Sequence, residues 1–132
     1  MIFHHLGIAT ANIETSQIAY SHLGYTGGVQ IYDPIQKVNI SFLMKPHSPM
    51  IELVSPTEES SPVNNFLKKN GTIPYHTCFE VKDLEDNIIK LKKGKFILIV
   101  KPVPAIAFQN RRVCFLYNKD TGLIELLEGF YK

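Results

Sequence analysis

The sequence predicts an α+β fold in which two βαβββ modules form a cupped, eight-stranded mixed sheet. The main observation is an internal repeat. The run HLGIATANIE, which starts at His5, aligns at a shift of 71 with HTCFEVKDLE, which starts at His76. The later run VNISFLMKPHSPMIEL, residues 38–53, aligns at a shift of 73 with RRVCFLYNKDTGLIEL, residues 111–126. Two blocks in the same order indicate a duplicated structural unit.

The second observation is that each copy has the same order of local patterns. In the first copy, an apolar run over residues 2–10 predicts a strand. Asn12 is a typical N-cap for a helix that runs to about residue 23, where Gly24 ends it. Bounded apolar or alternating runs predict three more strands, over residues 29–32, 38–45 and 50–55.

The second copy repeats this order. A strand is expected over residues 75–81, then a helix that Asp83 caps and that Gly94 ends in the left-handed conformation. Three strands are expected over residues 96–101, 112–118 and 123–128. The polar segment 56–71 is expected to be a linker with one short helix, 63–69. The prediction is therefore one domain, residues 1–132, with repeats 1–55 and 72–132.

The composition is typical of a cytoplasmic globular protein. Of the 132 residues, 45% are hydrophobic and 20% are charged, and the formal net charge of +2 argues against nucleic acid or an anionic membrane surface as a partner. No apolar run reaches the ~18 residues of a membrane span, and the start of the chain lacks the pattern of a signal peptide. The two cysteines, Cys78 and Cys114, lie in apolar strands, which favours reduced, buried thiols.

Each copy keeps one histidine in its first strand and one glutamate in its last. His5 and Glu52 are 47 positions apart, and His76 and Glu125 are 49 apart. Because alternate side chains of a strand share a face, each of the four points away from apolar neighbours that would pack against the helices. The four side chains are thus expected on one side of the sheet.

This combination favours a metal centre. A carboxylate in the middle of a half-buried strand is costly unless it is paired or binds a cation. A single histidine or glutamate in a strand is more often structural, but duplication at matched spacing reverses that expectation. Imidazole with carboxylate suits Zn, Ni, Co, Mn or Fe(II), and the identity of the ion stays open.

Three further residues are weaker candidates for contact with a substrate. Arg112 follows the loop PAIAFQN and could pair with an anionic group, and Asn39 is its counterpart in the repeat. Cys78 shares the face of His76, where it is expected to line a cavity.

The chain resembles the vicinal-oxygen-chelate superfamily, which includes glyoxalase I, methylmalonyl-CoA epimerase, extradiol dioxygenases and bleomycin-resistance proteins. The resemblance covers essentially the whole chain and is carried by HHLGIAT, IELVSP, YHTCFEVKDLE and RRVCFLYNKDTGLIELLE. It implies a metal held by His5, Glu52, His76 and Glu125. The same ligand set is common in glyoxalase I, whereas epimerases often carry glutamine at the second position.

The resemblance implies a metal-dependent lyase or isomerase, lactoylglutathione lyase-like or methylmalonyl-CoA epimerase-like. Its substrate would be a small thioester or thiohemiacetal that loses a proton next to a carbonyl and passes through a metal-bound enediolate. Glu125 is the expected base and Glu52 the second candidate. The strand VNISFL contains no carboxylate, which argues against a second base there. The resemblance also implies a homodimer, in which the two modules could pair within one chain or between two chains.

Two alternatives have other requirements. An extradiol-type dioxygenase needs only two histidines and one glutamate, so a fourth ligand at Glu52 argues against it. A drug-binding resistance protein needs no catalytic metal, so the retention of all four ligands argues against that function.

Overall fold

The computed structural model describes residues 1–129 and, over these residues, contains nine strands, three α-helices and one short 3₁₀ helix. The chain divides into two compact units. The N-terminal unit is His5–Tyr75, and the C-terminal unit combines Met1–His4 with the chain from His76 onward. Each unit contains one copy of the repeat.

The N-terminal unit is a mixed sheet. Its two parallel strands are neighbours in the sheet, and a helix lies between them in the sequence. Its first long strand pairs in parallel with its last, and the strand between them in sequence pairs antiparallel with the last. Two short strands pair with the outer side of that middle strand. The elements are β1 (Ile2–Ala9), α1 (Ile13–Ser21), β2 (Thr26–Gly27), β3 (Ile31–Asp33), β4 (Val38–Met44), β5 (Met50–Pro56) and α2 (Val63–Asn70).

The C-terminal unit repeats this arrangement with one long edge strand. Again the first strand pairs in parallel with the last, and two antiparallel pairings complete the order β6-β9-β8-β7. The elements are β6 (Ile73–Val81), α3 (Leu84–Lys93), β7 (Ile97–Pro104), the 3₁₀ helix Ile106–Phe108, β8 (Arg112–Asn118) and β9 (Gly122–Glu128). A parallel pair needs a crossover, which α1 and α3 supply in the two units.

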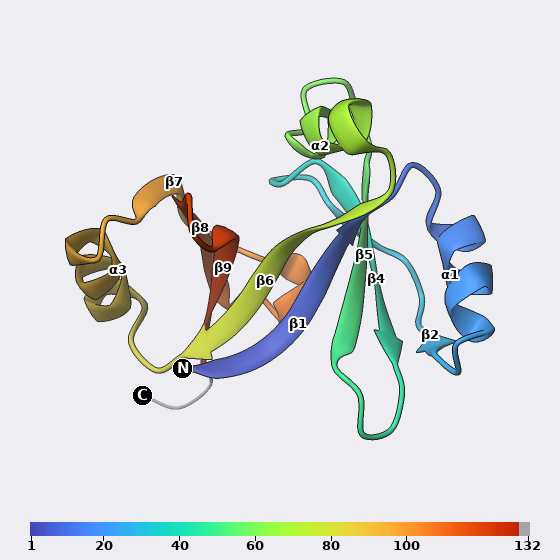
Figure 1. Cartoon of the computed structure of the whole chain (residues 1–132), viewed down its shortest axis with the longest axis horizontal. Coiled ribbons are helices and arrows are strands. Elements are labelled where there is room, and N and C mark those ends of the chain that lie inside the picture. Colours follow the sequence, from blue (N-terminus) through green and yellow to red (C-terminus); the bar gives the residue numbers. More distant parts are fainter. Residues whose placement is uncertain (130–132) are drawn as a thin grey trace. The chain divides into compact units, whose positions relative to one another are not determined.

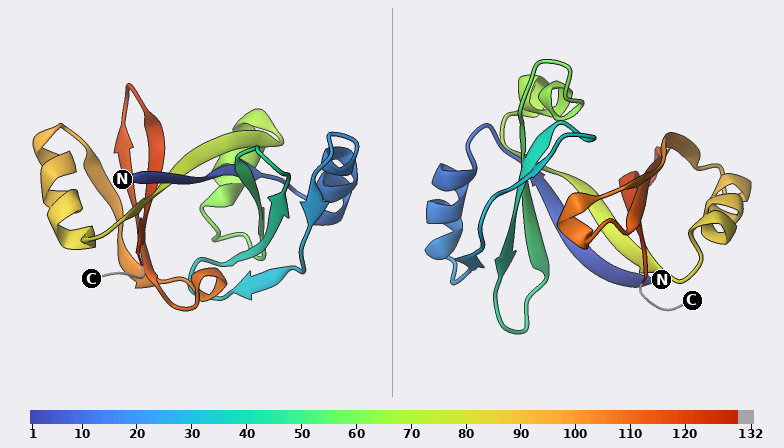
Figure 2. Two further views of the ribbon diagram at one scale, coloured as in Figure 1. Left: turned by 90° about the horizontal axis from the view of Figure 1, so that it is seen from below. Right: turned by 180° about the vertical axis from the view of Figure 1, so that it is seen from behind.

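The helices α1 and α3 each pack their apolar side against one face of their own sheet. Figure 1 shows α1 alongside the β4–β5 part of the N-terminal unit, and Figure 2 shows α3 beside the sheet of the C-terminal unit. The first core contains Ile8, Ile13, Leu43, Ile51 and Leu53. The second, which we call the α3 core, contains Val81, Leu84, Ile88, Cys114, Leu116, Ile124 and Leu126. The opposite face of each sheet is therefore left for the polar residues that alternate with these apolar ones.

The helix starts agree with the sequence. The Asn12 side chain accepts a hydrogen bond from the backbone N–H of Thr15 at 3.0 Å, and the Asp83 side chain accepts one from Asp86 at 2.8 Å. Both are N-cap contacts that satisfy a backbone donor at the helix terminus. The linker helix, expected over 63–69, is α2. The α+β class and the two βαβββ modules are confirmed.

Two local expectations are wrong. The strand expected over 29–32 is β3, which covers only Ile31–Asp33, and a separate two-residue strand, β2, precedes it at Thr26–Gly27. Between them, the Gln17 side-chain N–H donates to the Gly28 carbonyl at 3.1 Å. Gly94 has φ −85°, and Lys95 instead takes the left-handed conformation with φ 69°. The α3–β7 corner therefore turns at a lysine.

Both cysteines are reduced, buried thiols, as expected. Over residues 1–129, the helices are all too short or too polar to cross a membrane.

Candidate metal centre

The N-terminal unit brings His5 and Glu52 together on neighbouring parallel strands. The Cα partner of Glu52 on β1 is Gly7, so His5 lies two positions back along that strand and on the same face. The imidazole Nε2 and the carboxylate Oε1 are 3.3 Å apart. The two residues are 0% and 3% exposed, so both polar side chains lie out of bulk solvent.

The C-terminal unit builds the same pair with the same offset. The Cα partner of Glu125 on β6 is Cys78, and His76 again lies two positions back. The Nε2 of His76 is 3.3 Å from the Oε1 of Glu125, and the residues are 4% and 2% exposed. The duplication in sequence is therefore a duplication in geometry, because strand offset, atom spacing and burial agree in the two units.

A phenylalanine from the preceding antiparallel strand stands beside each pair. Phe42 is the Cα partner of Glu52, and its ring meets the His5 imidazole edge to face at a centroid distance of 6.1 Å. Phe115 is the partner of Glu125, and its ring meets His76 at 5.5 Å. These residues were not predicted as part of the site, although they match in the repeat at a shift of 73. The signal was present in the alignment but carried no chemistry of its own.

The donor atoms of each pair fit a divalent cation. Two atoms that each bind an ion at about 2.1 Å lie roughly 3.0–3.4 Å apart when the angle between them is about 90–110°. The observed 3.3 Å falls in this range in both units. A charge-assisted hydrogen bond between such atoms is typically shorter, about 2.7–2.9 Å. A shared cation therefore explains the 3.3 Å spacing better than a hydrogen bond within the pair. Imidazole nitrogen and carboxylate oxygen suit Zn, Ni, Co and Mn.

Asn39 lies on the face of β4 that is opposite to Phe42 and Glu52. Strand alternation places it with Ser41, whose hydroxyl accepts a hydrogen bond from Gln17 on α1 at 2.7 Å. The structure therefore does not bring Asn39 to the His5–Glu52 pair. Its contact with a substrate stays a prediction that the backbone does not favour.

Arg112 is held on the α3 side of the C-terminal unit. Its Nη1 and Nη2 donate to the two carboxylate oxygens of Glu85 at 2.6 and 3.1 Å, and Nη2 also donates to Glu128 at 2.7 Å. Hydrogen bonds that Arg112 donates to Glu128 and then to Glu85 raise the pKa of Arg112, and the Arg112 contact lowers the pKa of Glu85. These bonds tie β8 to α3 and β9, so the role of Arg112 toward a substrate also stays a prediction.

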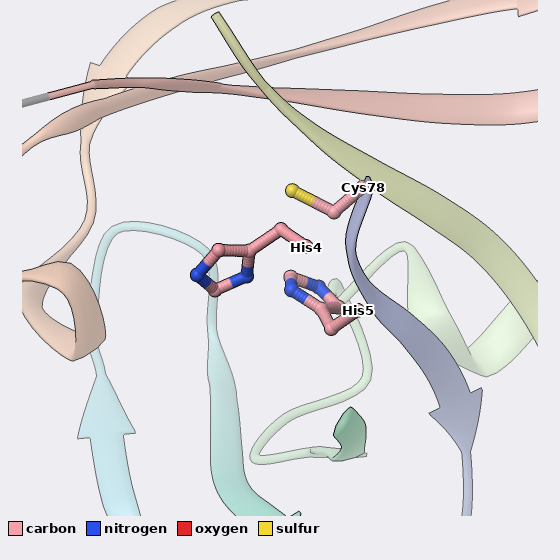
Figure 3. A group of neighbouring side chains, drawn as sticks. All are labelled: His4, His5 and Cys78. Atoms are coloured by element: carbon pink, nitrogen blue, oxygen red, sulfur yellow. The ribbon is translucent and has the colours of Figure 1, made fainter. Parts of the chain in front are cut away.

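Cys78 lies on the face of His76, as strand alternation required. A ring nitrogen of His4 and the Cys78 sulfur are within 4.8 Å of each other, and Figure 3 draws both side chains. The His4 ring also packs edge to face on Phe108 at 5.4 Å.

Cys114 is different, because it lies in the α3 core, where burial and then the Glu125 charge raise its pKa to about 12. Such a thiol is unreactive at neutral pH.

Comparisons with known proteins identify related chains. The family model of the Glyoxalase/Bleomycin resistance protein/Dioxygenase superfamily matches residues 4–115. The mitochondrial methylmalonyl-CoA epimerase of Dictyostelium discoideum is 32% identical over 132 residues, which cover 95% of this chain and 76% of the relative. The ethylmalonyl-CoA/methylmalonyl-CoA epimerase of Cereibacter sphaeroides is 33% identical over 128 residues, 93% of this chain and 94% of the relative.

A solved structure shows the same fold. The crystal structure of methylmalonyl-CoA epimerase from Mycobacterium tuberculosis has a TM-score of 0.82 and 30% identity, and it covers 96% of this chain and 86% of its own. Relatives and solved structure favour the epimerase branch over the lactoylglutathione lyase branch. The chain belongs to the Glyoxalase/Bleomycin resistance protein/Dioxygenase superfamily and is an isomerase of the epimerase type within it.

Proposed function

We propose that this protein epimerises an acyl-CoA at the carbon next to the thioester carbonyl, with methylmalonyl-CoA as the substrate to test first. The observation that carries the proposal is the pair of equal, buried His–Glu sites, one in each unit. The epimerase names of the relatives supply the substrate class.

We propose that His5, Glu52, His76 and Glu125 together bind one divalent cation. The spacing within each pair and the donor types support this, and the resemblance to the superfamily supports the set of four. When bound, such an ion polarises the substrate carbonyl oxygen and makes the neighbouring proton more acidic. Its identity among Zn, Ni, Co and Mn is a further question for elemental analysis.

Glu125 is the proposed base. A general base must accept the proton in a place where water does not compete, and Glu125 is buried beside the Phe115 ring. Its carboxylate would take the proton from the substrate α-carbon, and the configuration inverts when a proton is returned to the opposite face of the planar enolate. Glu52 is the second candidate, because it has the same surroundings in the other unit.

The test is exchange of the substrate α-proton in deuterated water. The wild-type protein, loaded with metal, is expected to exchange and epimerise methylmalonyl-CoA. Glu125→Gln is expected to lower the rate roughly 10²- to 10⁴-fold, the usual contribution of a general base, with an unchanged far-ultraviolet circular dichroism spectrum.

Glu52→Gln is the matched control. It removes the corresponding carboxylate of the other unit, where the resemblance implies that epimerases often carry glutamine, and it is expected to keep most of the activity. A wild-type protein that exchanges no proton of methylmalonyl-CoA would refute the proposed function. A folded Glu125→Gln variant with nearly full activity would remove Glu125 from the role of base.

A lactoylglutathione lyase-like activity is the second candidate, because both carboxylates are glutamates, as is common in glyoxalase I. Turnover of the methylglyoxal–glutathione adduct, measured beside the exchange assay, decides between the two. A faster reaction with the adduct would assign the lyase activity.

Three coarser features are proposed with this function. The units form a single domain, residues 1–132, in which segment 56–71 links repeats 1–55 and 72–132. The protein is a homodimer, which rests on the resemblance alone and which light scattering would test. It works in the cytoplasm, which the buried, reduced thiols of Cys78 and Cys114 support.

A further inference from the structure

The face of the C-terminal sheet that holds His76 and Glu125 continues beyond them along β8. Strand alternation places Phe115 and Tyr117 on this face, whereas Cys114 and Leu116 belong to the α3 core on the other. Ile97 on β7 is the Cα partner of Tyr117, so it shares the same face. We call Phe115, Tyr117 and Ile97 the apolar strip.

The apolar strip opens to solvent with distance from the His–Glu pair. Phe115, beside His76, is only partly exposed, but Tyr117 is 43% exposed and Ile97 is 62% exposed. Single exposed apolar residues need no explanation, but adjacent ones that continue from a buried polar site are typical of a binding surface. The strip has the form expected of a surface that leads from the reacting group to solvent.

Lysines gather where the apolar strip ends. Tyr117 is followed by Asn118, whose side-chain amide donates to the carbonyls of Gly94 and Lys95 at 3.5 and 3.4 Å. This contact fixes the α3–β7 corner at the end of β8. We define the basic corner as Lys92, Lys93, Lys95 and Lys119. Lys119 is paired with Asp120 at 3.2 Å, so the net charge of the corner comes from the other three.

We infer that the apolar strip and the basic corner bind the coenzyme A part of the substrate, an inference that rests on the proposed function. The pantetheine arm would lie over Tyr117 and Ile97, and the phosphates would meet the basic corner. Four residues of strand separate Phe115 from Lys119, roughly 13 Å. A long, weakly polar arm that ends in several negative charges is complementary to this surface in both polarity and charge.

The repeat supplies an internal comparison. At a shift of 73, Met44 is the counterpart of Tyr117, and it is similarly exposed, at 56%. Lys45, next to it, is engaged inside its own unit, because its Nζ donates to the Leu23 carbonyl at 2.8 Å and lies 5.8 Å from the centre of the Tyr25 ring. The N-terminal unit thus has the exposed apolar residue but holds the adjacent cation in place. Charge therefore favours the C-terminal unit as the coenzyme A site.

The first experiment measures the dissociation constant of free coenzyme A by calorimetry and the KM and kcat for methylmalonyl-CoA. Tyr117→Ala and Ile97→Ser are expected to raise both KM and the dissociation constant by about 5- to 20-fold, as loss of a central apolar contact does. Their kcat is expected to stay within about twofold, because neither residue contacts the His–Glu pair. Met44→Ala is the matched control and is expected to change neither constant.

The second experiment tests the phosphate end. Lys95→Asn removes the charge with a residue that tolerates the left-handed backbone, and it is expected to raise the KM for the acyl-CoA by about two- to fivefold. With the acyl-pantetheine thioester, which lacks the nucleotide and its phosphates, the same variant is expected to match the wild type. This difference between substrates separates phosphate contact from a general structural effect.

The outcomes separate the inference from the proposed function. Equal effects of Tyr117→Ala and Met44→Ala, or equal effects of Lys95→Asn on both thioesters, would overturn the inference while epimerase activity stands. If the wild type bound coenzyme A through Tyr117 but exchanged no α-proton, the binding surface would hold and the proposed reaction would fail.

Discussion

At the scale of single residues, the protein buries ionisable groups for two different reasons. His5, Glu52, His76 and Glu125 are nearly inaccessible yet polar, a placement that costs free energy unless a partner or a cation compensates. The Cys114 thiol is buried because it behaves as a small apolar group in the α3 core. The burial of the four polar side chains therefore indicates a functional site, whereas the burial of Cys114 indicates packing.

Cys114 makes the free energy of unfolding depend on alkaline pH. Burial and then the Glu125 charge raise its pKa from 9.0 to about 12. Between these values the unfolded chain loses this proton while the folded chain keeps it, so stability falls as pH rises through that window, by up to about 1 kcal/mol per pH unit. Denaturant unfolding of the wild type and Cys114→Ala from pH 8 to pH 10 tests this. The variant is expected to show a shallower decline, and equal slopes would contradict the assignment.

Arg112 is expected to act on structure and not on substrate. Arg112→Lys keeps the charge but loses the two-pronged contact with Glu85, so the melting temperature is expected to fall while KM for the acyl-CoA stays within about twofold. Steady-state kinetics beside thermal unfolding measure both. A large rise in KM with an unchanged melting temperature would restore Arg112 as a substrate residue.

At the scale of elements, the N-caps set the starts of α1 and α3. Asp83→Ala removes an acceptor for the Asp86 N–H and is expected to lower the free energy of unfolding by about 1 kcal/mol. Asp83→Asn, which keeps an acceptor oxygen, is the control and is expected to lose much less. Urea unfolding at pH 7 measures the difference, and equal losses in the two variants would show that charge, not capping, holds this helix end.

Elements with strong local signals could be predicted from the sequence, and elements set by tertiary contacts could not. β4 follows from alternation, β5 follows from a short apolar run after a turn, and α1 and α3 each begin at a recognisable cap. The segment between the short strands β2 and β3 makes a tertiary contact, in which the Gln17 side chain of α1 donates to the Gly28 carbonyl. The left-handed turn falls on Lys95 instead of Gly94, because the helix continues to hydrogen-bond through Gly94. No local pattern encodes either contact.

At the scale of the whole molecule, duplication is the organising feature. The sequence repeat predicts the four ligand candidates, and in each unit histidine and glutamate lie together at the same strand offset. The side chains around them were harder to predict, since a phenylalanine in a strand reads as core whichever face it occupies. Asn39 and Arg112 are predicted from their matching repeat positions. In the structure both lie on the face of the sheet that is turned away from the His–Glu pairs. Cross-strand register sets this placement and cannot be read from one sequence.

We propose that both pairs bind one ion, and metal content per chain tests this most directly. Elemental analysis after saturation with Zn and gel filtration is expected to give one ion per wild-type chain. The double variants His5→Ala/Glu52→Ala and His76→Ala/Glu125→Ala each leave only the other pair, and each is expected to lose most of the bound metal, because two ligands alone hold a divalent ion weakly. Two ions per wild-type chain, or full retention in either variant, would contradict a shared centre.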